Sequence, residues 1–204
     1  MDIKTHWDNV YTTKLPTQVS WFQPHAARSL EIIQKTGVVK TASIVDVGGG
    51  ASTLVDDLLA NGYTRLTVLD ISGPALQAAQ ARLGESASKV KWVEANVLEA
   101  PFEVGEFDVW HDRAVFHFLT SAQDRTAYVQ KVLAAVKPGG FVIVATFAGD
   151  GPEKCSGLPV QRYEPNELHS EFGNTFELMG HERETHTTPA GGAQKFVYCF
   201  CRRG

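Results

Sequence analysis

Two acidic side chains and a run of three glycines carry the clearest chemical signal in this chain of 204 residues. Asp46 lies in an apolar run that begins at Ser43, and the glycines occupy positions 48–50. Asp70 ends a second apolar run about twenty residues later. Glycine lets a backbone turn sharply and lets a ligand approach closely, and an acid at the end of the second strand can accept hydrogen bonds from both ribose hydroxyls. The spacing predicts a nucleotide-binding strand, turn and helix.

Two kinds of nucleotide site compete for this pattern. A dinucleotide fingerprint of the form G-x-G-x-x-G requires a third glycine at the position of Thr53. Asp46 stands two residues before the first glycine, where its charge would repel a diphosphate but suit a cationic ligand. Asp46-x-Gly48-x-Gly50 therefore favours a cationic ligand. A purely structural turn is the remaining alternative, and Asp70 at the matching distance argues against it.

Strand and helix signals alternate after residue 40, which is typical of a sheet with helices on both faces. The hydrophobic pattern predicts strands near 42–47, 65–70, 90–95, 106–110 and 139–147, and helices near 53–61, 74–83 and 122–136. A Gly/Pro-rich loop from Ala148 to about Pro165 follows, then a helix near 165–172 and an antiparallel pair at 175–186 and 194–202. We expect a single domain over 1–204, with a cap segment at 1–40 and an α/β core at 41–204.

Charge and composition argue against nucleic acid and membranes as binding partners. The formal net charge is -4, and no lysine or arginine run occurs beyond Arg202-Arg203, which argues against nucleic acid as the main substrate. The first residues lack the apolar core of a signal peptide, and no apolar stretch approaches the roughly twenty residues of a membrane span. We expect a soluble, cytoplasmic protein that does not bind membranes. The sequence does not indicate an oligomeric state.

The three cysteines are expected to be free thiols. Cys199 and Cys201 lie two residues apart in an apolar run, so on a strand they would share one face and pack against a helix. This pair supplies too few ligands for a metal site, and no neighbouring histidine completes a recognisable spacing. We predict no metal. Cys155 lies in the long loop, either as a contact to a soft substrate or without a function.

The order of these landmarks resembles the class I S-adenosylmethionine-dependent methyltransferases. The matching segments are Val45–Gly50, Asp70, Glu94–Asn96, Phe107–Trp110 and Lys137–Gly140. The resemblance implies a Rossmann-like, doubly wound, mostly parallel seven-stranded sheet with a carboxyl-terminal antiparallel hairpin and an amino-terminal helical cap. It also implies S-adenosylmethionine as the cofactor. The residues expected to bind it are Trp21, Asp46, Gly48, Gly49, Gly50, Asp70, Ile71, Asn96, Val97 and His111.

One position departs from the pattern of this family. Asn96 stands where the family usually carries an aspartate that receives the adenine amino group. An amide oxygen can still accept that hydrogen bond, so the departure weakens the contact in principle without excluding it.

Two finer resemblances point to different methyl acceptors. Residues 110–114 and the loop at 151–160 resemble the thiopurine and tellurite methyltransferase branch, whose acceptors are small. Residues 6–11 and 20–22 resemble the entry segment of small protein-lysine methyltransferases that act on elongation factors. We favour a small-molecule acceptor, such as a thiol or another soft nucleophile, because a thiol is partly ionised near neutrality whereas a lysine must first lose a proton. Protein-lysine methylation is the alternative.

Candidate catalytic residues follow the fourth predicted strand. His111, Asp112 and Arg113 are expected just beyond it, at the carboxyl edge where open α/β sheets bind ligands. Asp112 could orient an acceptor or take its proton, and Arg113 could hold an anionic group or lower the pKa of a thiol. The alternative is a surface ion pair between these two residues that caps the loop. His117 is a further candidate base, with a structural role as its alternative.

The amino-terminal cap is expected to close over the cofactor. Trp21 and Phe22 precede a helix whose Ala26, Leu30 and Ile33 would pack on the core. An aromatic ring beside a sulfonium offers cation–π attraction of roughly 0.5–2 kcal/mol, and a lid of this kind excludes water. Plain core packing of each ring is the alternative.

Overall fold

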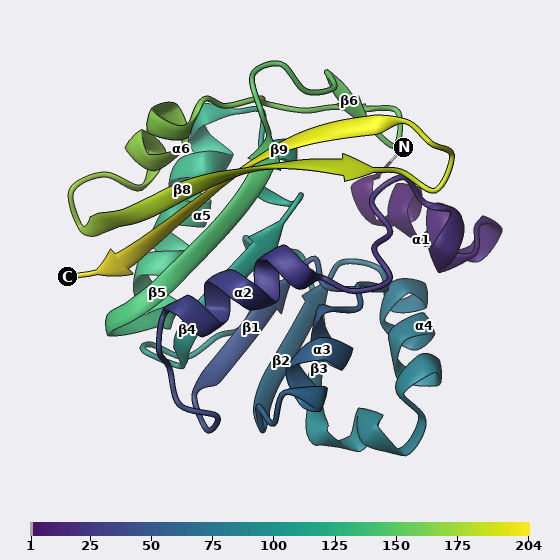
Figure 1. The fold of residues 1–204 in the computed structure, drawn as a ribbon, viewed down its shortest axis with the longest axis horizontal. Helices are drawn as coiled ribbons and strands as arrows, with labels where there is room; N and C mark the ends of the chain where they lie inside the picture. Colours follow the sequence, from purple (N-terminus) through teal and green to yellow (C-terminus); the bar gives the residue numbers. More distant parts are fainter. Residues whose placement is uncertain (1) are drawn as a thin grey trace.

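The computed structural model describes residues 2–204, and its centre is one seven-stranded sheet (Figure 1). The strand order is β3-β2-β1-β4-β5-β9-β8. Neighbours from β3 to β5 are parallel, and β9 is antiparallel to both β5 and β8. The predicted fold class is therefore confirmed. The strands are β1 (Ser43–Val47), β2 (Arg65–Asp70), β3 (Val90–Glu94), β4 (Phe107–Arg113), β5 (Val136–Phe147), β8 (Phe176–Thr187) and β9 (Ala193–Arg203).

Helices cover both faces of the sheet because consecutive strand residues point to opposite sides. Ile44 belongs to one buried cluster with residues of α2, α3 and α4, and Val45 belongs to a second cluster with residues of α5 and α6. The helices are α1 (Ile3–Thr13), α2 (Ala27–Lys35), α3 (Leu54–Ala60), α4 (Gly73–Leu83), α5 (Ala122–Ala135) and α6 (Pro165–Phe172). Short 3₁₀ turns are η1 (Pro16–Gln18), η2 (Gly84–Lys89) and η3 (Phe116–Phe118). No helix within 2–204 has the length and apolar character that crossing a bilayer requires.

The fourth strand is longer than predicted. It runs to Arg113, so His111, Asp112 and Arg113 lie within the end of β4 and not beyond it. The sequence pattern misses this extension because three consecutive polar residues look like a loop. Each of them finds a buried or half-buried partner from a distant element, described below.

The fifth strand also begins earlier than predicted, at Val136. Its pairing with β4 slips between Phe107 and Val109, so the Pro-Gly-Gly segment bulges out without ending the strand. A Cβ atom on Gly140 would lie 2.9 Å from the carbonyl oxygen of Lys137, so the bulge requires glycine there. This bulge lets the strand start at residue 136 and not at 139.

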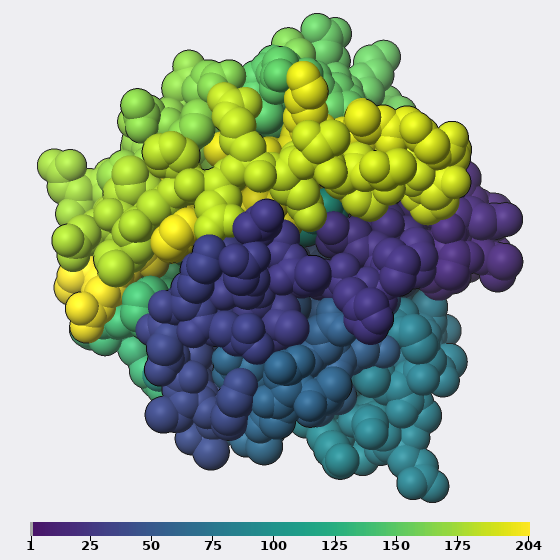
Figure 2. Space-filling view, viewed as in Figure 1, coloured from purple at the N-terminus to yellow at the C-terminus, as the bar shows by residue number. Residues whose placement is uncertain are grey.

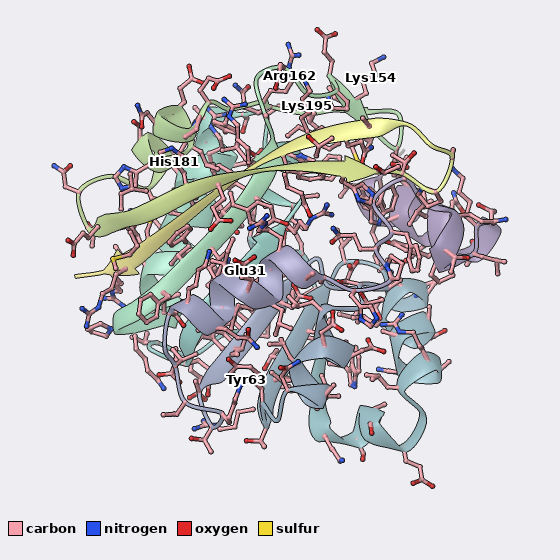
Figure 3. The ribbon with its side chains drawn as sticks, in the orientation of Figure 1. Glu31, Tyr63, Lys154, Arg162, His181 and Lys195 are labelled. Atoms are coloured by element: carbon pink, nitrogen blue, oxygen red, sulfur yellow. The ribbon has the colours of Figure 1, made fainter. Side chains whose placement is uncertain are left out.

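Ion pairs link helix α2 and the loop after β5 to the carboxyl-terminal strands β8 and β9. On α2, where Figure 3 labels Glu31, Arg28 and Lys35 both bind Glu182 of β8, at 2.6 and 2.8 Å. The loop after β5 holds a small hairpin of β6 (Lys154–Cys155) and β7 (Leu158–Pro159), where the sequence predicted only a loop. Lys195, labelled near that hairpin in Figure 3, binds Asp150 at 2.7 Å.

The amino-terminal segment crosses the molecule between two other regions. Figure 2 shows residues of this segment, in purple, between the yellow carboxyl-terminal strand and the blue and teal surface formed by residues before about 90. Helix α1 contacts α4 (Figure 1). The segment therefore lies over the carboxyl edge of the parallel strands, where ligands of such sheets bind.

Candidate functional site

The turn after β1 brings backbone close to two carboxylates. Gly48 has a φ of 65°, a conformation that residues with a side chain rarely adopt. A Cβ atom on Gly49 would lie 2.5 Å from Oδ2 of Asp46, and a Cβ atom on Gly50 would overlap the carboxylate of Asp70. The carboxylates of Asp46 and Asp70 thus lie directly against the backbone of the turn, in space that a side chain at Gly49 or Gly50 would need, although Gly50 itself lines neither of the cavities described below.

A cavity of about 340 Å³ opens at this edge of the sheet. Its size suits a small organic ligand. One side consists of residues at the ends of β1, β2 and β3, and another consists of residues from α1, the segment before α2, β4 and η3. The sequence-predicted residues on its wall are Trp21, Gly48, Asp70, Ile71, Asn96, Val97 and Arg113.

Asp70 provides a buried carboxylate on this wall. Burial raises its pKa to about 7, with a smaller contribution from the nearby charge of Asp46, although backbone N–H groups oppose the shift. The amide of Ser72 donates to Oδ1 at 2.8 Å. A desolvated acceptor that faces a cavity gains most from a ligand that supplies hydroxyl donors.

Asn96 has a local role in addition to its place on the cavity wall. Its side-chain oxygen accepts a hydrogen bond from the backbone N–H of Leu98 at 3.1 Å. This contact orients the amide and uses one of the two lone pairs of the oxygen. A second hydrogen bond from a ligand donor is therefore compatible with the structure.

A second, smaller cavity of about 50 Å³ adjoins the first and shares Tyr11, Trp21, Gly48 and Arg113 with it. Asp46 lies on its wall, with an exposed fraction of 4%. Within residues 2–204, Oδ2 of this carboxylate has no hydrogen-bond partner. A buried, unpartnered anionic oxygen is costly, so the site favours a ligand that brings a cation or a donor.

His111 lies behind Asp46 and faces the smaller cavity, not the larger one. Its Nδ1 atom is 2.7 Å from Oδ1 of Asp46, and its Nε2 atom is 2.8 Å from the hydroxyl of Ser29 on α2. All three side chains are buried. Sequence analysis selected His111 but missed Ser29, because no local pattern places α2 against β4.

Asp112 is fully buried and lies on neither cavity wall. The hydroxyl of Tyr128 donates to its carboxylate at 2.5 Å, and the backbone N–H of Val115 donates at 2.9 Å. Burial raises its pKa to about 6, although these hydrogen bonds oppose the shift. The geometry favours a role in holding the turn at Ala114, where φ is 72°. Its catalytic assignment stays a prediction.

The alternative of a surface pair between Asp112 and Arg113 is wrong, because Arg113 has other partners. Its guanidinium donates to Glu184 at 3.2 Å and to the hydroxyl of Tyr198 at 3.0 Å, and it lies 4.0 Å from the centre of the Phe196 ring. Burial would lower the pKa of Arg113, but Tyr198 and Glu184 more than offset that effect. Arg113 therefore remains a cation on the walls of both cavities.

Four aromatic rings form a continuous part of the larger cavity's wall. The ring of Trp7 packs edge-to-face on Phe118 at 5.3 Å and on Trp21 at 5.7 Å, and the indole N–H of Trp21 lies 3.2 Å from the hydroxyl of Tyr11. Trp7 and Tyr11 were missed as cavity residues. Their spacing of four on a helix is the signal that places both rings on one face. Phe22 faces the smaller cavity only.

Of the two remaining candidate residues, Cys155 borders a cavity and His117 does not. Cys155 is on the wall of the larger cavity, and burial raises the pKa of its thiol to about 12, so the thiol is neutral. His117 lies on neither wall, and burial lowers its pKa to about 3, so its ring is neutral too. Across residues 2–204, no group of three or more His, Cys, Asp or Glu side chains has a metal-binding arrangement.

Comparison with known proteins agrees with this geometry. The sequence profile of a family described as "Methyltransferase domain" matches residues 44–140. The human protein named EEF1A lysine methyltransferase 2 is 24% identical over 190 residues, which covers 86% of this chain and 75% of the relative. These matches include the glycine turn, Asp70 and the end of β4.

Two solved structures share the fold. One, from work titled "Conversion of a Disulfide Bond into a Thioacetal Group during Echinomycin Biosynthesis", superposes with a TM-score of 0.77 at 17% identity and covers 99% of this chain and 92% of the other. Another is the 1,6-didemethyltoxoflavin-N1-methyltransferase of Burkholderia thailandensis, with a TM-score of 0.71, 18% identity, and coverage of 98% and 87%. The methyltransferase profile over residues 44–140, the relatives named methyltransferases and the shared fold together support a class I S-adenosylmethionine-dependent methyltransferase. Its cofactor is S-adenosylmethionine.

Proposed function

We propose that the two cavities together bind S-adenosylmethionine. Asp70 would accept hydrogen bonds from the ribose hydroxyls, and Asn96 and Val97 would border the adenine. Asp46 would meet the ammonium of the amino acid end in the smaller cavity. Two features of the chain fit this group: the unpartnered Oδ2 of Asp46, and the glycines that let the carboxylates of Asp46 and Asp70 lie against the turn.

We propose further that the methyl acceptor is a small molecule with a soft nucleophile and no positive charge. The observation that carries this proposal is the composition of the wall formed by Trp7, Phe118, Cys155 and Arg113. It is aromatic, it includes a neutral thiol, and it holds a permanent cation. The guanidinium of Arg113 is a charged donor on this wall even though it is paired with Glu184, and such a donor favours a thiol or another group that reacts as an anion.

The cofactor supplies a methyl group that is already electrophilic, so the chain needs to align the acceptor and exclude water. The rings of Trp7, Trp21 and Phe118 shield the cavity from solvent. Arg113, held by Glu184 and Tyr198, would stabilise the anionic form of the acceptor. Neither Cys155 nor His117 is suited to take a proton, because the thiol is itself protonated and the imidazole has a very low pKa.

Methylation of a protein lysine is the second candidate, and the relationship to the human lysine methyltransferase over 86% of the chain favours it. This reaction needs an opening that admits an extended side chain, and it needs the lysine to be neutral before it attacks. Helix α1 would have to shift or open to admit a lysine from a folded protein.

A labelling experiment separates the two candidates. The protein is incubated with methyl-tritiated S-adenosylmethionine and either a panel of small thiols, selenols and phenols or purified elongation factor 1A, and label is measured in the small-molecule and protein fractions. We expect label in the small-molecule fraction and a loss of that signal in Trp7→Ala. Leu15→Ala, at a residue with 63% of its surface exposed, is the matched control. Label confined to lysines of the elongation factor would overturn the small-molecule proposal.

A further inference from the structure

Three buried side chains from three separate elements are hydrogen-bonded in series, and all three residues border the smaller cavity. Ser29 of α2 bonds Nε2 of His111 on β4 at 2.8 Å, and Nδ1 of His111 bonds Oδ1 of Asp46 on β1 at 2.7 Å. The exposed fractions are 1%, 2% and 4%, so water does not compete for these contacts. The other oxygen of Asp46 is buried and unpartnered within the described chain, in a residue that borders the cavity.

The direction of these hydrogen bonds follows from the chemistry of the groups. A carboxylate only accepts, so Nδ1 of His111 must donate to Asp46. In the neutral ring, Nε2 then accepts from the hydroxyl of Ser29. This arrangement uses one acceptor site on Oδ1 of Asp46 and leaves Oδ2 without a partner within residues 2–204.

We propose that Ser29 and His111 are positioning residues that orient Asp46 toward the ammonium group of the cofactor. The inference rests on the proposed placement of the amino acid end in the smaller cavity. Without this pair, the carboxylate of Asp46 is free to rotate about its last bond and loses a donor that stabilises its charge. Ligands with an ammonium group would then bind less tightly, whereas ligands without one would be unaffected.

The test compares two ligands that share an adenosine and a thioether. S-adenosylhomocysteine carries the amino acid group, and 5′-methylthioadenosine lacks it. Calorimetric titration is carried out on the wild-type protein, Ser29→Ala, His111→Gln, Asp46→Asn and the control Ser170→Ala, which changes a serine on α6. We expect Ser29→Ala to weaken S-adenosylhomocysteine by about 3- to 10-fold and to change methylthioadenosine by less than about 2-fold.

A purely structural role would give a different pattern, with equal losses for both ligands in Ser29→Ala and His111→Gln, and that result would overturn the inference. Alanine is a better helix former than serine, so the Ser29 variant should retain its fold, and thermal unfolding checks this.

Nitrogen-15 shifts of the His111 ring add a second readout. We expect a protonated Nδ1 and an unprotonated Nε2 in the wild type, with a changed Nε2 shift in Ser29→Ala. An unchanged shift would remove the Ser29 contact from the proposal. Failure of the wild type to bind S-adenosylhomocysteine would instead refute the proposed cofactor site.

Discussion

The two sides of the larger cavity are built in different ways. The side that faces the proposed adenosine position comes from one continuous stretch of the chain, between Val47 and Leu98, and its polar groups are Asp70 and Asn96. The opposite side combines Trp7, Trp21 and residues of β4, η3 and β6, which come from well-separated parts of the chain between residues 7 and 155.

This difference suggests that the fold provides cofactor binding, whereas the individual protein provides recognition of the methyl acceptor. A strand, a glycine turn and an acid at the next strand end can hold the same cofactor wherever the sheet is formed. The acceptor side depends on how the amino-terminal segment and the carboxyl-terminal hairpin pack, so its aromatic and charged groups determine which molecule is methylated. Substitutions on the first side should therefore affect cofactor binding, and substitutions on the second should affect turnover.

The largest effect is expected from Gly49→Val. The new side chain would begin 2.5 Å from Oδ2 of Asp46 and 2.9 Å from Val68, so it would displace the carboxylate or the turn. We expect binding of S-adenosylhomocysteine to weaken by about 100-fold or more, measured by calorimetry. Gly192→Val, in the turn between β8 and β9, is the control and should bind normally. Normal binding by the Gly49 variant would show that the ligand does not approach this turn.

Deletion of residues 1–24 should impair methyl transfer while it leaves the fold intact. It removes Trp7, Tyr11 and Trp21 but leaves the sheet, so we expect the fold to persist and turnover to fall by about 100-fold through loss of water exclusion. Circular dichroism and a methyl-transfer assay measure these outcomes. In the intact protein, added S-adenosylhomocysteine should slow proteolysis near Lys14. Full activity after truncation would make the segment a passive appendage.

Asp70→Ala should weaken cofactor binding by about 1.5–3 kcal/mol, because the ribose hydroxyls would lose hydrogen bonds to a charged acceptor. The effect should be the same for S-adenosylmethionine and S-adenosylhomocysteine, since the two ligands share the ribose. Calorimetric titration of both checks this. Wild-type affinity in the variant would remove Asp70 from the site.

The raised pKa of Asp70 also predicts a pH dependence. Burial and Asp46 bring this pKa to about 7, so at pH 6 most of the carboxyl is protonated and its capacity to accept from two hydroxyls is reduced. Affinity for S-adenosylhomocysteine should therefore rise by about 10-fold between pH 6 and pH 8. Asp70→Asn has no such proton to lose and should show a flat profile. A slope that persists in Asp70→Asn would assign the dependence to another group.

Cys155→Ser should have the smallest effect, a change in turnover of less than about 3-fold. Its thiol is neutral because burial raises the pKa to about 12, so it contributes surface and no charge. Steady-state rates for the same acceptor measure this, and cofactor affinity should not change. A loss of about 100-fold would indicate that the thiol contacts the acceptor directly.

Much of the cofactor side could be predicted because its signals are local. The alternation of apolar runs, the glycines at 48–50 and the acid at Asp70 lie within thirty residues, and the strand order then follows from the family pattern. The end of β4 was predicted less well. His111, Asp112 and Arg113 resemble a loop until their partners Ser29, Tyr128 and Glu184 are in place, and those partners lie on three other elements.

The sequence alone determined the class of fold through its periodicity and glycine turn, and its resemblance to a known family implied the cofactor and the acids that are expected to hold it. The tertiary structure decided which polar residues face a cavity and which support the backbone. Asp112 was chosen as a catalytic group, yet it lies buried under a turn, whereas Trp7 and Ser29 reach the cavities from segments far along the chain. The physical reason is that a buried polar group takes its role from its hydrogen-bond partners, and those partners come together only when the sheet, the cap and the hairpin pack.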